Sequence, residues 1–149
     1  LVLHLLHLHR PYRAGELLAA ALAEGRLPAT PQRLARLADA WLLAREEAKA
    51  RQALARAAPK MADGNLYLQW AQLEYTREDW AAVARTAEKA LAKGGLRQPG
   101  RAHLLLGIAH LRQGQAGAAR AALSQAQRYR HTRGGATQWL RHLERHANS

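Results

Sequence analysis

Apolar residues recur along this chain at the spacing of one helix face, and the spacing itself repeats. Leu34, Leu37, Ala38 and Trp41 lie at positions i, i+3, i+4 and i+7, which is the pattern of an amphipathic helix. Five further stretches carry the same periodicity, at 47–57, 67–74, 80–90, 103–110 and 116–126. Short breaks at 44–46, 77–79 and 113–115 interrupt it. The chain is therefore predicted to form three pairs of helices, each pair joined by a tight turn.

Small residues occupy the same place in each predicted pair. Ala38, Ala71 and Gly107 hold corresponding positions, at intervals of 33 and 36 residues. A small side chain at a helix crossing lets two backbones approach closely, whereas a large one holds them apart. We expect each of the three to face the small residue twelve positions further on, in the second helix of its pair. Those partners are Ala50, Val83 and Ala119.

Proline, glycine and capping residues mark the boundaries of the predicted pairs, which occupy 31–61, 64–96 and 100–131. Thr30-Pro31 is a typical N-cap followed by proline in the first turn. Residues 1–28 match a further pair whose first helix, 1–9, is truncated. After the last pair, the stretch 133–146 carries Trp139 on an amphipathic helix that is predicted to cap the array with a polar outer face.

Composition agrees with an all-α fold in one domain of 149 residues. Apolar residues make up 48% of the chain and Phe is absent, so Leu and Ala must fill the core. Ala, Leu, Arg, Gln and Glu are good helix formers, and β-branched residues, which favour strands, are scarce. No apolar run approaches the length that spans a bilayer.

The third pair resembles the tetratricopeptide repeat (TPR) family. Leu106-Gly107, Gly114, Ala119 and Ala126 fall where that family has its Leu-Gly pair, turn glycine and two alanines, and a period of about 34 residues is typical of it. The resemblance covers nearly the whole chain. It implies a right-handed α-solenoid of antiparallel helix pairs with a C-terminal capping helix. It also implies a non-enzymatic scaffold that binds a protein or peptide partner.

A narrower resemblance extends from residue 63 to residue 140. The runs 63–68, 92–96, 99–100, 102–107 and 138–140 look like the C-terminal part of bacterial TPR proteins associated with TonB-type energy-transduction systems, which are extracytoplasmic. This resemblance implies a periplasmic location, with the cytoplasm as the alternative. Because the chain begins without Met inside an apparent helix, we expect it to be a piece of a longer bacterial protein.

The first helices of successive solenoid units line a concave groove, and helical phase selects the residues that face it. Amide side chains suit a peptide backbone, Leu and Ile suit an apolar anchor, and Arg suits acidic groups. Chaperone-binding TPR proteins hold a carboxylate with a Lys/Asn/Arg clamp. Here Ala35, Leu68 and Asp39 stand at clamp positions, so that specificity is not expected. The predicted groove residues are Arg36, Asp39, Leu43, Asn65, Gln69, Gln72, Tyr75, Arg101, Leu104, Ile108 and Arg112, with His4 and His7 extending the row.

Positive charge offers an alternative function. The net charge is +12, and residues 97–149 contribute nine Arg against the single acidic residue Glu144. Clustered Arg is the footprint of nucleic-acid or anionic-surface binding. However, Arg outnumbers Lys throughout the chain, which also fits GC-rich coding, so a protein partner is preferred to nucleic acid. The residues of this possible patch are Arg120, Arg128, Arg130, Arg133, Arg141 and Arg145.

Candidate catalytic and metal-binding groups have structural interpretations. The chain has no Cys, which excludes disulfides and thiolate metal sites. The groups His4/His7/His9 and His142/His146 lack the carboxylate or third ligand that would complete a site. The acidic pairs at 46–47 and 78–79 stand at helix starts, where they complement the helix dipole. We therefore predict no enzyme activity, metal or cofactor in this chain, although a catalytic domain upstream stays possible.

The truncated first helix leads to one further expectation. Its apolar residues Leu1, Leu5 and Leu8 would lack the helix that normally covers them. An uncovered apolar face favours association with a second copy. We expect this chain to form a dimer through that face.

Overall fold

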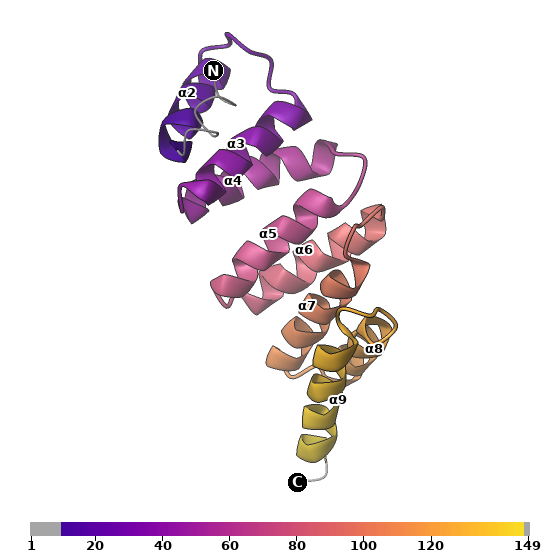
Figure 1. The fold of residues 1–149 in the computed structure, drawn as a ribbon. Helices are drawn as coiled ribbons and strands as arrows, with labels where there is room; N and C mark the ends of the chain where they lie inside the picture. Colours follow the sequence, from indigo (N-terminus) through magenta and orange to yellow (C-terminus); the bar gives the residue numbers. More distant parts are fainter. Residues whose placement is uncertain (1–9, 148–149) are drawn as a thin grey trace. The chain divides into compact units, whose positions relative to one another are not determined.

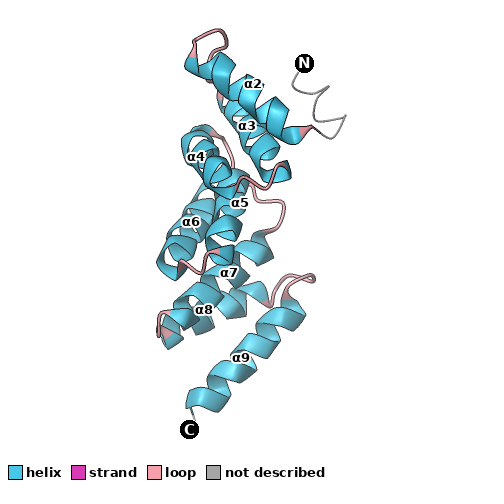
Figure 2. Cartoon of the chain, turned by 90° about the vertical axis from the view of Figure 1, so that its left-hand side faces the viewer, coloured by secondary structure: helices cyan, strands magenta, loops and turns pink. Residues whose placement is uncertain are grey.

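The computed structural model describes residues 10–147, which form helices, turns and loops with no strand among them (Figure 2). The predicted all-α class is thus confirmed. A short 3-10 helix, η1 (Ala58–Lys60), follows α4 and was not predicted. The α-helices are α2 (Pro11–Ala23), α3 (Pro31–Leu43), α4 (Glu47–Ala57), α5 (Asn65–Thr76), α6 (Trp80–Lys93), α7 (Pro99–Arg112), α8 (Ala116–Ala126) and α9 (Arg133–Ala147) (Figure 1).

Contacts divide the chain into two compact units. Unit 1 comprises Leu1–Met61 and contains α2, α3, α4 and η1, and unit 2 comprises Ala62–Ser149 and contains α5 to α9. Within each unit, consecutive helices contact one another. Each predicted range 31–61, 64–96 and 100–131 contains two helices joined by a turn. A single solenoid over 1–149 stays a prediction.

The turns inside the three pairs have one structure. At the end of α3, Glu46 N donates to Trp41 O at 2.8 Å and Arg45 N donates to Leu42 O at 3.0 Å. These two bonds define the Schellman motif, whose penultimate residue adopts a left-handed conformation. The left-handed residue is Arg45 after α3, Glu78 after α5 and Gly114 after α7. Their φ angles are 60°, 58° and 76°. The matching bonds there are Asp79 N to Glu74 O, Glu78 N to Tyr75 O, Gln115 N to His110 O and Gly114 N to Leu111 O.

Side-chain caps fix two of the helix starts. Thr30 Oγ1 accepts a hydrogen bond from Arg33 N at 3.2 Å, at the beginning of α3, which confirms the predicted N-cap. Asp79 Oδ1 accepts from Ala82 N at 3.2 Å, at the beginning of α6. The capping explanation of the 78–79 acidic pair is therefore correct for Asp79.

Unit 1 packs around small residues. Ala38 and Ala50 are fully buried, as is Leu54, and Trp41 is 5% exposed. A Cβ on Gly15 of α2 would lie 2.8 Å from Cε3 of Trp41. The absence of a side chain at Gly15 therefore lets α2 lie directly on the indole ring.

Unit 2 also packs around small residues, with one difference from the prediction. Ala71 and Val83 are fully buried, as expected for a crossing of α5 and α6. Gly107 of α7 is buried, but the side chain against it is Leu123, whose Cγ would lie 2.7 Å from a Cβ at Gly107. The backbone N of Leu123 would itself lie 3.3 Å from that Cβ, so α7 and α8 approach each other closely at these two residues.

The last helix covers the preceding pair. Leu143 of α9 is buried in one cluster with Ala119 and Leu123 of α8, and Trp139 packs against that cluster. The predicted contact of Trp139 with the third pair is thus confirmed. Trp70 and Trp80, whose apolar side chains would suit the core, are half-buried. More than half of the buried apolar residues are Ala.

Candidate protein-binding groove

Three adjoining hollows in unit 2 bring most of the predicted groove residues together. The amide hollow, of about 270 Å³, is lined by Asn65, Leu68, Gln69, Gln72, Arg97 and Gln98. The apolar hollow, of about 300 Å³, is lined by Gln72, Tyr75, Thr76, Arg101, Leu104, Leu105 and Ile108. The basic hollow, of about 230 Å³, is lined by Arg97, Gln98, Pro99, Gly100, Arg101, Tyr129, Arg130, His131 and Thr132.

Shared residues make these hollows one continuous feature, which we call the unit-2 groove. Gln72 lines both the amide and the apolar hollow. Arg97 lines both the amide and the basic hollow, and Arg101 lines both the basic and the apolar hollow. A single ligand could therefore occupy all three at once.

Helices α5 and α7 supply most of the lining because they contact each other directly in unit 2. Gln69, Gln72 and Tyr75 recur at the three-residue spacing of one face of α5, and Leu104 and Ile108 recur on one face of α7. Ile108 is only 5% exposed, so it forms part of the floor of the apolar hollow. Leu104 is half-buried and offers the accessible apolar surface.

Asn65 uses its amide within the protein. Its Oδ1 accepts from the backbone N of Arg97 at 3.1 Å, and its Nδ2 donates to Gly95 O at 3.3 Å. Gly64 N also donates to Gly94 O at 2.9 Å. The side chain predicted to contact a ligand thus has a positioning role, because it holds the loop that carries Arg97.

Gln69 contributes an unpaired polar atom. Its Oε1 is buried and has no hydrogen-bond partner among the described residues. An unsatisfied buried acceptor destabilises a fold by about 1–3 kcal/mol. Stability therefore does not explain a glutamine at this place in the amide hollow.

Arg112 lies apart from the unit-2 groove. Its guanidinium carbon is 5.6 Å from the ring centre of Trp80 and 5.8 Å from that of Trp139. Such distances are typical of cation–π contacts. Arg112 therefore bridges α6 and α9 and lines none of the three hollows.

The remaining predicted residues lie on α3 in unit 1. Arg36 and Asp39 are exposed, and Leu43 is 63% exposed. Although the Asp39 side chain is exposed, neighbouring atoms displace part of the water around its carboxyl group, and this desolvation raises the pKa of Asp39 above its ordinary value. A role for these residues in ligand binding stays a prediction. The hollow of unit 1 is lined by Tyr12, Glu16, Ala19, Leu37, Trp41, Lys49, Gln52, Ala53 and Arg56.

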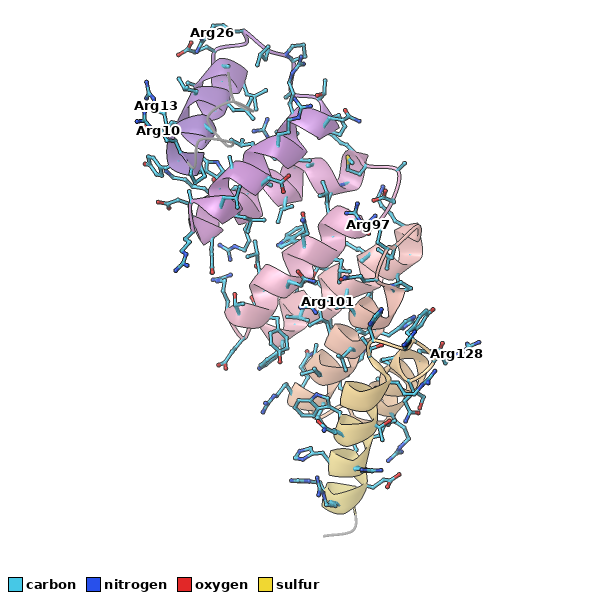
Figure 3. All side chains as sticks on the ribbon, viewed as in Figure 1. Arg10, Arg13, Arg26, Arg97, Arg101 and Arg128 are labelled. Atoms are coloured by element: carbon cyan, nitrogen blue, oxygen red, sulfur yellow. The ribbon has the colours of Figure 1, made fainter. Side chains whose placement is uncertain are left out.

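The basic hollow is the part of the groove that sequence reasoning missed. Helical phase along α7 indicated Arg101, but it could not show that the loop after α8 folds back onto the start of α7. Figure 3 labels Arg97 and Arg101 near that start and Arg128 after α8. The only signals in the sequence were the Pro99-Gly100 step and the basic run at 128–131.

Tyr129 is held in place by an aromatic contact. Its ring stacks on His103 of α7, with ring centres 6.1 Å apart and planes inclined by 19°. Burial, and secondarily the positive charge of Arg128, lowers the pKa of His103 below the ordinary 6.5. The imidazole is therefore neutral at pH 7, and a neutral ring stacks without desolvating a charge.

The histidines considered as metal ligands have few neighbours of the required kind. Among residues 10–146, no group of three His, Cys, Asp or Glu side chains is arranged to hold a metal ion. The rings of His142 and His146 lie 4.0 Å apart, and His146 Nδ1 lies 2.9 Å from the carbonyl oxygen of His142. The predictions that involve residues 1–9, namely the histidines there and the dimer face, lie outside the described residues.

No helix within the described residues is long and apolar enough to cross a membrane. No protein-family model matches the chain, and no curated protein matches it. The likeness to TPR proteins therefore rests on the residues and spacings of the chain itself.

Proposed function

We propose that this chain is a non-enzymatic protein-interaction module of the TPR type, and that its unit-2 groove binds a segment of a partner protein. The observation that carries this proposal is the juxtaposition of the amide hollow and the apolar hollow on the contacting helices α5 and α7. Amide side chains at one end of the groove suit the backbone of a bound segment. The apolar surface at the other end suits one anchoring side chain of that segment.

The repeated turn structure supports the TPR assignment within this proposal. The helices α3, α5 and α7 end on the same pair of backbone hydrogen bonds, although the residue with positive φ is Arg, Glu or Gly. The shared ending turns the chain in the same way after the first helix of each pair, which supports a repeated unit. We infer that the pairs stack as antiparallel units of a right-handed α-solenoid with α9 as its cap.

The location and context follow from the resemblance alone. The likeness to TonB-associated TPR proteins favours the bacterial periplasm over the cytoplasm, and a larger protein of which this chain is part. Fusion of the gene to a reporter that is active on only one side of the inner membrane would separate the two compartments. Reporter activity only in the cytoplasm would contradict the periplasmic proposal.

The proposed function can be tested by panning a phage library of random 12-residue peptides on the purified chain. A Gln72→Trp variant places a bulky ring at the residue shared by the amide and apolar hollows. The matched control is Gln138→Trp, because Gln138 is exposed on α9 and lines no part of the groove. Peptides selected on the parent should be lost on Gln72→Trp and kept on the control.

Two results would count against the groove. A library that yields no enriched peptide under conditions where the chain is folded would remove the proposed function. Equal binding to the parent and the Gln72→Trp variant would place the interaction elsewhere on the molecule. Circular dichroism of each variant establishes that the helices are intact.

A further inference from the structure

We propose that the basic hollow receives the carboxylates of an acidic partner segment, so that the unit-2 groove selects segments with an acidic residue about three positions from an apolar one. This inference rests on the proposed function, since it names the class of segment that the same groove takes. It is carried by charge complementarity, by the fixed walls of the hollow and by the distance between the hollows.

Positive charge in the basic hollow is uncompensated. Arg97, Arg101 and Arg130 are exposed, and none of their guanidinium groups forms an ion pair or a hydrogen bond with another described residue. Elsewhere in unit 2, Arg77 pairs with Glu74 at 3.5 Å, and Arg133 donates to the backbone. The three arginines of the hollow thus keep their binding capacity for a ligand.

Acidic side chains are absent from the described lining of the groove, and the nearest carboxylate that bonds to a lining residue is Asp63, whose Oδ1 accepts from Asn65 N at 3.1 Å. Residues 62–149 contain Asp63, Glu74, Glu78, Asp79, Glu88 and Glu144. None of them is among the described residues that line the three hollows. A planar guanidinium binds a carboxylate through two parallel hydrogen bonds. Carboxylates are therefore the natural complement of this surface.

The walls of the basic hollow are fixed before any ligand arrives. Asn65 holds the backbone of Arg97, and Thr132 Oγ1 donates to Ala126 O at 2.8 Å. A Cβ at Gly100 would lie 2.7 Å from Cβ of Tyr129, so the loop after α8 packs closely on α7. Fixed walls lower the entropy that binding must remove, although the Arg side chains themselves are free to adjust.

The distance along α7 sets the spacing in the partner. Arg101 lines both the basic and the apolar hollow, and Ile108, seven residues further along α7, lines the apolar hollow. Seven residues of helix span about 10 Å. An extended chain covers about 3.3–3.6 Å per residue, so the same distance corresponds to about three residues of a bound segment. The acidic and apolar residues of the partner should therefore be about three positions apart, in either order.

A nucleic acid fits this arrangement less well. Its backbone carries a phosphate at every nucleotide, and proteins that follow it present basic residues along the whole path. Here the positive charge stops at Arg101, and the adjoining lining is Gln72, Tyr75, Leu104 and Ile108. Charge at one end and an apolar surface at the other match a peptide.

The test uses the random 12-residue library on two charge variants of the full chain. The variant Arg97→Gln/Arg101→Gln removes two charges from the groove. The control Arg85→Gln/Arg120→Gln removes two charges from exposed residues of α6 and α8 that do not line it. Peptides selected on the parent should carry Asp or Glu about three positions from Leu, Ile or a similar residue. This acidic preference should be much weaker on the groove variant, which keeps only Arg130 of the three arginines, and should persist on the control.

Affinities then give the magnitude. By fluorescence anisotropy of one selected peptide, the groove variant should bind about tenfold more weakly than the parent, since two exposed charge pairs together have a modest effect. The control should change binding by less than about twofold. Replacing the acidic residue of the peptide by its amide should weaken binding to the parent, and should weaken binding to the groove variant, which keeps Arg130, by a smaller factor.

Different results overturn different statements. Selected peptides without an acidic preference, or equal affinities for parent and groove variant, would overturn this inference and leave the peptide groove intact. A library with no enrichment would overturn both. A single-stranded DNA oligonucleotide that binds the parent more tightly than the selected peptide, and that loses affinity on the groove variant alone, would assign the basic hollow to nucleic acid instead.

Discussion

Adding one methyl group at Gly107 should destabilise the protein, against the usual effect of the same change in a helix. Replacing a helical glycine by alanine ordinarily stabilises a helix by about 0.8–1.0 kcal/mol. At Gly107 the new Cβ would lie 2.7 Å from both Cγ and Cδ2 of Leu123, well inside the 3.5–4.0 Å of an optimal carbon contact. Leu123 is fully buried, and its backbone N would lie 3.3 Å from the same Cβ, so rotation of the side chain alone does not remove every close contact.

The two effects have opposite signs, and overpacking is the larger. Forcing an extra carbon into a packed core costs about 1–3 kcal/mol, which exceeds the gain in helix propensity. The expected net result for Gly107→Ala is a loss of about 1 kcal/mol. Gly117 of α8 provides the control, because a Cβ there would have no neighbour within 4 Å. Gly117→Ala should gain about 1 kcal/mol.

Urea unfolding followed by circular dichroism gives the free energy of unfolding of each variant. The values for Gly107→Ala and Gly117→Ala should differ by about 2 kcal/mol. Shortening the opposing side chain supplies a further check: in a Leu123→Ala background, Gly107→Ala should become neutral or stabilising. The reasoning is refuted if Gly107→Ala stabilises the parent as much as Gly117→Ala does.

Three more outcomes are expected. Glu78→Gly should raise the free energy of unfolding by about 1 kcal/mol, because a non-glycine residue at φ 58° is strained. Urea unfolding measures the change, with Glu78→Gln as the control for the lost charge. A loss of stability in Glu78→Gly would contradict this prediction. The pKa of His103 is lowered in the folded protein, so the unfolded chain binds more protons just below pH 6.5 and the free energy of unfolding should fall as pH drops through that value. His103→Gln should therefore reduce the difference between the urea midpoints at pH 7 and pH 5.5. An unchanged difference would refute a role of His103 in this pH dependence. Arg112→Ala should lower the free energy of unfolding by about 1–2 kcal/mol, because the contacts of Arg112 with Trp80 and Trp139 are lost. Arg112→Lys should lower it by less. Equal losses in the two variants would argue against the contacts with the rings.

The helix pattern could be predicted because it is local. Three- and four-residue spacing placed the helices of each pair and the breaks between them, and Ala38 and Ala71 are fully buried as that spacing required. The partner of Gly107 was harder to predict, since its contact with Leu123 depends on how α7 and α8 pack against each other. The half-buried positions of Trp70 and Trp80 likewise depend on how neighbouring helices pack.

The groove could be predicted only in its α5 and α7 parts. Gln72, Leu104 and Ile108 follow from the phase of single helices. Arg112 has the right phase, but two indole rings from other helices compete for its guanidinium. The contact of the loop at 129–132 with the start of α7 joins segments thirty residues apart, and no periodicity along one helix encodes such a contact.

The alanine-rich interior has a consequence for inheritance. In most proteins the harmful change in a core removes atoms and leaves a cavity. Here more than half of the buried apolar positions are Ala. Most single-base changes of an alanine codon that alter the amino acid add atoms to the side chain, since they give Val, Ser, Thr, Pro, or one of Asp and Glu. Random mutation therefore tends to enlarge buried side chains and to force these helices apart. Natural selection on this chain thus acts chiefly against substitutions that replace a buried alanine by a larger residue.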